Sequence, residues 1–208
     1  FALAGEERAA KLYDSVLTQY GDDSVAQSMF LQIVVEKASN ILTKMLEWSR
    51  LGAYLETSTR YIFFDRLDED GRFRYYTPAL PIGLRSPYIQ YMDKLFGLYS
   101  AIVRGVTDHV RKRVPMPSDE IERAAWMSST RAQACDAARL VLPAATMSTV
   151  SIVGTAQMIE NLILHLAAHD LKECQQAAKG ILREVRKVAA PLFKRTDLPE
   201  RGGATVAY

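Results

Sequence analysis

The sequence has few cysteines and little net charge. Its only cysteines, Cys135 and Cys174, lie far apart, and neither has a histidine or cysteine at metal-ligand spacing. The sequence therefore predicts neither a disulfide framework nor a metal site, and the expected location is a reducing cytoplasm. The formal net charge of +2 gives no global electrostatic reason to bind nucleic acid or an anionic membrane.

Long apolar runs and a targeting segment are also missing. No apolar run approaches the length of a membrane span, and no charged segment with a cleavage site opens the chain. With 49% hydrophobic and 24% charged residues, the composition is typical of a globular protein. The length fits a single domain over residues 1–208. Because the chain starts at Phe1 and ends at Tyr208 shortly after Arg-Gly-Gly, we expect that domain to be part of a longer chain.

The apolar pattern predicts an α+β fold with few strands. Residues 30–35 and 146–153 are apolar or β-branched, which is typical of strands, and residues 61–64 and 73–76 flank Asp-Glu-Asp-Gly as in a hairpin. Apolar spacing, caps and prolines predict helices over residues 6–20, 40–49, 88–114, 115–142, 157–166 and 171–193. Asp170 is the expected N-cap of the last helix. Because the strands are scattered, we expect a small mixed or antiparallel sheet with several long helices.

Residues 50–61, which we call the signature segment, read Arg-Leu-Gly-Ala-Tyr-Leu-Glu-Thr-Ser-Thr-Arg-Tyr. Glu56, Ser58 and Arg60 alternate by two, so in an extended chain their side chains leave the same face. A carboxylate, a hydroxyl and a guanidinium on one face suit a phosphorylated, hydroxylated ligand. A solvated loop between a helix and a strand explains the same residues, and spacing alone leaves both interpretations open.

The signature segment, with Trp48 and Ser49 before it, resembles the motif R-H-R-x-x-S-x-x-x-x-S-x-R of flavin-dependent thymidylate synthases, which Tyr often follows. Two other blocks are similar to blocks of that family. The run from Gly21 to Gln27 resembles Gly-His-Glu-Ser-Val-x-Glu-His, and Ala-Arg-Leu-Val-Leu-Pro at residues 138–143 resembles Ala-Arg-(Ile/Val)-Leu-Pro. The three blocks follow the family order and, with the helix after them, cover about residues 21–173. The resemblance therefore implies the fold of this family.

The resemblance assigns most of the matching residues to a pyrimidine nucleotide. It implies that Arg60 and Arg139 hold the phosphate and base of dUMP or UMP, since arginine offers paired donors in a rigid fork. Ser58 is expected against the nucleotide, and Glu56 is expected to accept from a sugar hydroxyl. Arg50 matches the last arginine of the motif's first triplet and is expected at both the substrate and the cofactor. Ser58 and Arg139 are the expected catalytic residues.

The cofactor side of the family pattern is altered in this chain. The first arginine of the motif is Trp48 and its histidine is Ser49, while the histidine of the first block is an aspartate. Asn161 matches an asparagine that lies near the flavin in the family. His165 stands where the family has an arginine, and Ser24 belongs to the first block. The resemblance implies that these residues, with Arg50, contact FAD.

Three functions are compatible with this sequence. The resemblance implies an enzyme that methylates C5 of dUMP or UMP, with methylenetetrahydrofolate as carbon source and FAD passing on a hydride from NADPH. It also implies a homotetramer with its sites between subunits. Because the cofactor side is altered, the chain is alternatively a degenerate or half-site domain of a larger family member, which binds nucleotide or assembles a tetramer. An unrelated helical interaction module is the third possibility.

Overall fold

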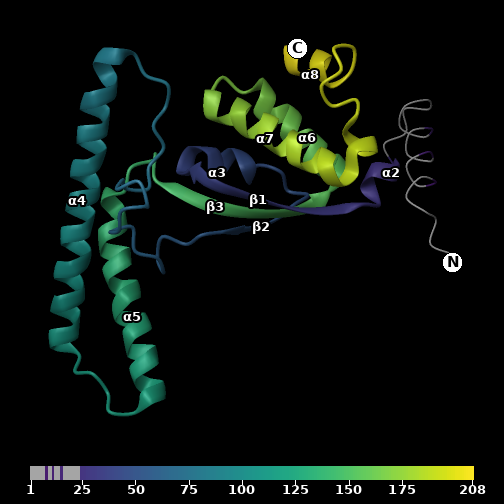
Figure 1. Cartoon of the computed structure of the whole chain (residues 1–208). Coiled ribbons are helices and arrows are strands. Elements are labelled where there is room, and N and C mark those ends of the chain that lie inside the picture. Colours follow the sequence, from purple (N-terminus) through teal and green to yellow (C-terminus); the bar gives the residue numbers. More distant parts are fainter. Residues whose placement is uncertain (1–7, 9–10, 12–14, 16–23) are drawn as a thin grey trace. The chain divides into compact units, whose positions relative to one another are not determined.

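The computed structural model describes residues 8, 11, 15 and 24–208, which form two compact units (Figure 1). The first unit contains the described part of Phe1–Glu36 together with Leu42–Leu55 and Thr149–Tyr208. The second unit contains Lys37–Ile41 and Glu56–Ser148. Apart from three positions, the helix predicted over residues 6–20 lies outside the described residues. That the chain is a single domain of a longer protein stays a prediction.

A three-stranded sheet carries most of the first unit. Its strands are β1 (Phe30–Ser39), β2 (Ala53–Glu56) and β3 (Met147–Thr155), in the order β1-β3-β2. β1 and β3 are antiparallel, because the Ala156 amide donates to the Met29 carbonyl while the Asn40 amide donates to the Thr146 carbonyl. The two strands predicted over residues 30–35 and 146–153 are therefore confirmed. So is the predicted α+β class with a small antiparallel sheet and several long helices.

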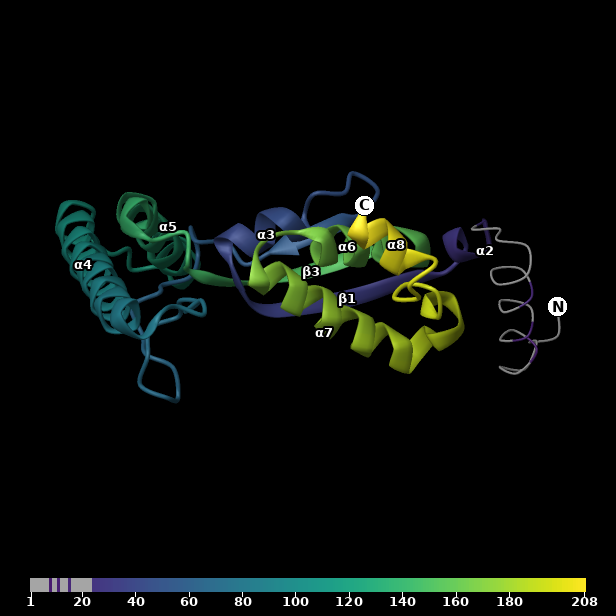
Figure 2. The same cartoon turned by 90° about the horizontal axis from the view of Figure 1, so that it is seen from above.

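Helices cover one face of this sheet (Figures 1 and 2). The helices of the first unit, one of which begins in the second unit, are α2 (Ser24–Gln27), α3 (Asn40–Leu46), α6 (Ala156–Ala168), α7 (Lys172–Ala189) and α8 (Gly202–Ala207). Central β3 alternates between buried and partly exposed residues, and its Val150 and Ile152 are fully buried. Gly154 leaves room for α6, since a Cβ atom there would lie 2.6 Å from the sulfur of Met158.

Two helix starts in the first unit test the predicted caps. Thr155 caps α6, because its hydroxyl accepts from the Met158 amide at 3.2 Å. The prediction that Asp170 caps α7 is wrong. The helix begins one residue later than predicted, with Leu171 as an N-cap that makes no side-chain capping bond, and the Leu171 amide donates to Nδ1 of His169 at 3.1 Å.

The second unit contains two long helices that lie side by side, α4 (Ile82–Arg113) and α5 (Glu120–Ala138) (Figure 1). α4 begins earlier than predicted, because Pro87 is accommodated near the start of the helix instead of ending the preceding loop. Asp119 caps α5 by accepting from the amides of Ile121 and Glu122, both at 3.0 Å. The helix predicted over residues 115–142 therefore begins later than predicted, at Glu120. It ends at Ala138 and continues as a 3-10 turn, Arg139–Val141.

The predicted hairpin over residues 61–64 and 73–76 is wrong. The turn between the two segments forms, with Gly71 at a positive φ of 73° and the Asp68 amide donating to the Arg72 carbonyl. However, Tyr75 pairs with Thr146 in an isolated antiparallel bridge. Burial explains the difference, because Phe64 and Tyr75 both enter the core of the second unit instead of facing each other across a ladder.

That core is aromatic. It consists of the buried residues Phe64, Tyr75, Phe96, Tyr99, Val103 and Ala138. The Tyr75 hydroxyl donates to Asp93 at 2.9 Å, and the Tyr99 hydroxyl accepts from the Phe64 amide at 3.4 Å. Burial raises the pKa of Tyr75 and of Tyr99 to about 12, since the phenolate is the form that desolvation disfavours.

The second unit is expected to lose stability at alkaline pH. Because the folded state raises the pKa values of Tyr75 and Tyr99, their contribution is fully present below the unfolded pKa near 10 and is lost as the pH rises towards about 12. Denaturant midpoints measured over this range should therefore fall. In Tyr99→Phe the fall should be smaller, and an identical fall in both proteins would contradict this account.

Among the described residues, no helix has the combined length and apolar character that a membrane crossing requires.

Candidate functional site

The signature segment is extended only in its first half. β2 ends at Glu56, and the chain then turns, with the Tyr61 amide donating to the Ser58 carbonyl at 3.2 Å. The Ser58 hydroxyl accepts from the Arg60 amide at 3.2 Å, a local bond with which serine competes against strand geometry. Of the two interpretations left open by the sequence, the extended one, in which Glu56, Ser58 and Arg60 share one face, does not apply beyond Glu56. The turn determines where Arg60 points.

The end of β2 is tied to β3. The Ser148 hydroxyl donates to the Thr57 carbonyl at 3.3 Å. Thr57 lies between Glu56 and Ser58, both of which are half-buried. The backbone that carries these two side chains is thus fixed by a hydrogen bond between residues far apart in the sequence. Spacing alone gave no indication of this bond.

Arg60 and Arg139 meet on one carboxylate, that of Asp136. The Nε and Nη2 atoms of Arg60 donate to the two oxygens of Asp136, each at 3.0 Å, and Nη2 of Arg139 lies 3.3 Å from Oδ1. We call these three residues the Asp136 cluster. Their side chains are 36–50% exposed, so solvent reaches all of them. The structure thus brings together the two arginines that the resemblance assigns to a nucleotide.

The Asp136 cluster matters more for the local charge at the surface than for the stability of the fold. The hydrogen bond from Arg60 lowers the pKa of the Asp136 carboxyl, and the charges of both arginines act in the same direction. Exposed ion pairs contribute little to folding. The cluster therefore presents two oriented guanidinium groups at the surface, and a planar anion of similar geometry can exchange for Asp136.

Asp136 is not among the residues that the sequence predicted for the site. A signal for it was present, because an acid three residues before an arginine on a helix lies on the same face. Arg139 occupies the junction between α5 and the 3-10 turn, where Ala138 is fully buried and anchors the helix end. This anchor fixes the position of the arginine.

In the first unit, Trp48 and His165 stack on each other. Their ring centroids are 4.4 Å apart and the planes differ by 8°. Trp48 is 64% exposed, while Nε2 of His165 is buried and makes no hydrogen bond to any described residue. The backbone carbonyl of Ser49 accepts from the Tyr54 hydroxyl at 2.6 Å. Two of the residues expected at FAD, Trp48 and His165, thus form an aromatic surface with one unsatisfied polar atom.

The remaining cofactor-side residues are more dispersed. Arg50 is exposed in the turn before β2, and the Ser24 side chain lies outside the described part of the chain. Asn161 is exposed on α6, one helical turn before His165, and lines a cavity of about 330 Å³. Buried Glu160 lines the same cavity and accepts from Arg195 at 3.1 Å.

The expected site residues divide between the two units. Those assigned to the nucleotide, Glu56, Ser58, Arg60 and Arg139, belong to the second unit, whereas Arg50 and the described cofactor-side residues belong to the first. Among the described residues, no group of three side chains is arranged to hold a metal ion.

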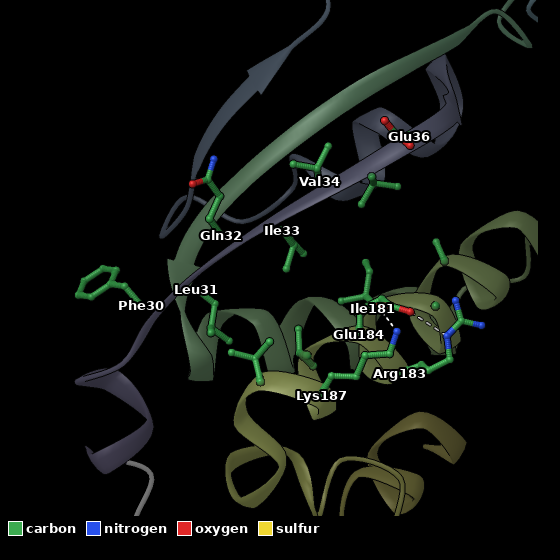
Figure 3. Close-up of a pocket in the computed structure, with 15 residues that line it drawn as sticks. Phe30, Leu31, Gln32, Ile33, Val34, Glu36, Ile181, Arg183, Glu184 and Lys187 are labelled. Carbon is green, nitrogen blue, oxygen red and sulfur yellow. Dashed lines mark hydrogen bonds and ion pairs between the residues drawn. The ribbon is translucent and has the colours of Figure 1, made fainter. Parts of the chain in front are cut away.

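Another cavity, of about 680 Å³, lies between β1 and α7 (Figure 3). Phe30 and Val34 are exposed on the strand. On the helix, Glu184 pairs with Arg183 at 2.9 Å and with Lys187 at 2.6 Å, so these charges largely neutralise one another. None of the residues predicted for the site lines this cavity, and its chemistry is apolar.

Comparison with known proteins identifies the family. A family model described as thymidylate synthase complementing protein matches residues 2–191. A UPF0159 protein of Chlamydia pneumoniae is 32% identical over 194 residues, which cover 92% of this chain and 36% of the relative. UPF0159 proteins of Chlamydia muridarum and Thermoplasma acidophilum are 30% and 28% identical, with 93% and 87% of this chain and 37% and 41% of the relatives covered.

The chain spans less than half the length of these relatives. The family match nevertheless extends over most of the chain and includes the signature segment, Asp136 and Arg139. The chain therefore belongs to the thymidylate synthase complementing protein family, the flavin-dependent family that its motifs resemble.

Proposed function

We propose that this chain is the nucleotide-binding part of a thymidylate synthase-like enzyme that methylates C5 of dUMP or UMP. The observation that carries the proposal is the convergence of Arg60 and Arg139 on one exposed carboxylate. The two guanidinium groups are oriented and accessible, and a phosphate offers the same planar pairs of acceptors with more charge than a carboxylate. Membership in the family supports the reaction class.

In this proposal the chain acts by binding and orientation. The phosphate of the nucleotide replaces Asp136 on one or both arginines, while the turn at Ser58 keeps Arg60 in place. The Ser58 hydroxyl lies beside the bound nucleotide, and Glu56 accepts from its sugar. Arg139 polarises the base, because a fixed cation stabilises charge that develops on a pyrimidine oxygen. No nucleophilic side chain is needed.

The residues of the first unit fit a flavin. Trp48 and His165 provide an aromatic surface, and the buried Nε2 of His165 needs a hydrogen-bond partner that a polar ring edge can supply. Ser49, Arg50, Asn161 and Ser24 are the other residues proposed to hold FAD. When bound, FAD transfers a hydride derived from NADPH, and methylenetetrahydrofolate supplies the carbon. The chain contributes orientation and the exclusion of water.

The proposed assembly is a homotetramer in which several chains complete each site. This arrangement rests on the resemblance to the family, since the two compact units that share the expected residues belong to one chain. The two buried free cysteines, Cys135 and Cys174, support a cytoplasmic location.

A half-site domain is the second candidate. Trp48 and His165 stack on each other, so one face of each ring is already covered. The chain also spans only 36–41% of the length of its relatives. In that case the chain binds nucleotide, and the flavin site is completed by another segment or is lost.

The visible absorption spectrum of the purified protein, recorded with FAD before and after adding dUMP or UMP, tests both candidates. The enzyme predicts a bound flavin band that shifts when the nucleotide is added, and Trp48→Ala should weaken the band without changing nucleotide affinity. A protein that stays colourless but binds nucleotide supports the half-site domain. Failure to bind either ligand would contradict both.

A further inference from the structure

Three arginines gather in a pocket of the second unit that no residue of the Asp136 cluster lines. The pocket has a volume of about 440 Å³. Its walls are Arg66 from the loop after the signature segment, Arg111 from α4 and Arg131 from α5, with Tyr61, Phe63 and Met127 between them. Three elements that are separate in the sequence thus each contribute an arginine to the wall of one pocket.

The positive charges of this pocket are not neutralised. No carboxylate lines it, and within the described part of the chain Arg66, Arg111 and Arg131 form no ion pair. Asp65 precedes Arg66 in the sequence but is not among the lining residues. Three like charges that line one pocket repel one another, so a bound anion would remove an unfavourable interaction.

Two of the guanidinium groups are held in place. Arg131 lies over the Phe63 ring at 4.6 Å, and Arg111 lies over the Trp126 ring at 5.2 Å. The Nε of Arg111 also donates to the hydroxyl of buried Thr130 at 3.3 Å. These contacts use the faces and one edge of the guanidinium planes. The terminal nitrogens remain as oriented donors for a ligand.

The apolar part of the pocket suits a ring. Tyr61 is 59% exposed and Met127 is 51% exposed, so both offer accessible surface next to the arginines. The volume is that of a small-molecule site, and the net charge of +2 gives no extended field of the kind that binds a nucleic acid backbone. The pocket therefore combines charge for at least two anionic groups with surface for one planar group.

We propose that this pocket is a second anion site, which binds a small ligand that contains both a planar ring and two or more phosphate groups, as a nucleoside diphosphate does. The site is independent of the proposed nucleotide site, because its arginines are different residues. Phosphate oxygens accept from the terminal nitrogens of Arg66, Arg111 and Arg131, and the ring lies against Tyr61 and Met127.

Calorimetric titrations with ADP and with pyrophosphate test the proposal. The intact protein is expected to bind both, with ADP the tighter ligand because only ADP has a ring. Arg66→Gln and Arg131→Gln should each weaken ADP binding about tenfold, since each loses a charge-assisted contact. Arg104→Gln is the matched control, because Arg104 is exposed on α4 but does not line the pocket. It should bind ADP as the intact protein does.

The same experiment separates this site from the Asp136 cluster. Arg139→Gln should leave ADP binding unchanged, and loss of ADP binding in that variant would place the ligand at the cluster and overturn the second site. Equal ADP affinity in Arg66→Gln, Arg131→Gln and Arg104→Gln would also overturn it. Tighter binding of a single-stranded oligonucleotide than of ADP would identify the ligand as nucleic acid instead. Circular dichroism and the melting temperature without ligand verify that each variant is folded.

Discussion

Replacing Arg139 by alanine is expected to weaken dUMP or UMP binding by about tenfold or more. The side chain offers two donors to a phosphate, and hydrogen bonds to a charged group are stronger than neutral ones. The pair between Arg60 and Asp136 remains in the variant, so the fold should be unaffected. Isothermal titration calorimetry measures the effect directly.

Two further variants make this test specific. Asp136→Asn removes the charge with which a phosphate competes for Arg60 and Arg139, so nucleotide affinity should rise or stay equal. Arg104→Ala changes an exposed arginine of α4 outside the cluster and should have no effect. If Arg139→Ala binds nucleotide as tightly as the intact protein, Arg139 is not part of the site.

Replacing Phe96 by alanine should lower the free energy of unfolding by about 3–5 kcal/mol. Phe96 is fully buried, and its ring lies 5.3 Å from that of Phe73 and 5.7 Å from that of Tyr75. The truncation leaves a cavity that these rings cannot fill by small movements. Because Ala138 packs in the same cluster, the end of α5 that carries Asp136 and Arg139 should loosen as well.

Denaturant unfolding followed by circular dichroism measures this loss. Phe96→Leu keeps most of the volume and should cost less than about 1.5 kcal/mol, which makes it the control if the alanine variant does not fold. Nucleotide affinity should fall in the alanine variant and change little in the leucine variant. Similar unfolding free energies for the two variants would contradict the role assigned to this core.

The sequence predicted the elements with strong local signals. Strands at residues 30–35 and 146–153 and the α+β class follow from apolar patterns, which act within a few residues. Errors occurred where a distant partner decided the outcome. Tyr75 pairs with Thr146 rather than with its neighbouring segment. The predicted cap at Asp170 is a local error, because α7 begins one residue later.

For the candidate site, the sequence by itself determined the family, because motifs are local patterns of residue types, while the assignment of residues to the nucleotide stays a prediction. Only the tertiary structure decided that Arg60 and Arg139 share Asp136, that Trp48 stacks on His165, and that Arg66, Arg111 and Arg131 line one pocket. The physical reason is that spacing fixes which residues share a turn or a face. Contacts between residues far apart in the sequence depend on how whole helices and strands pack.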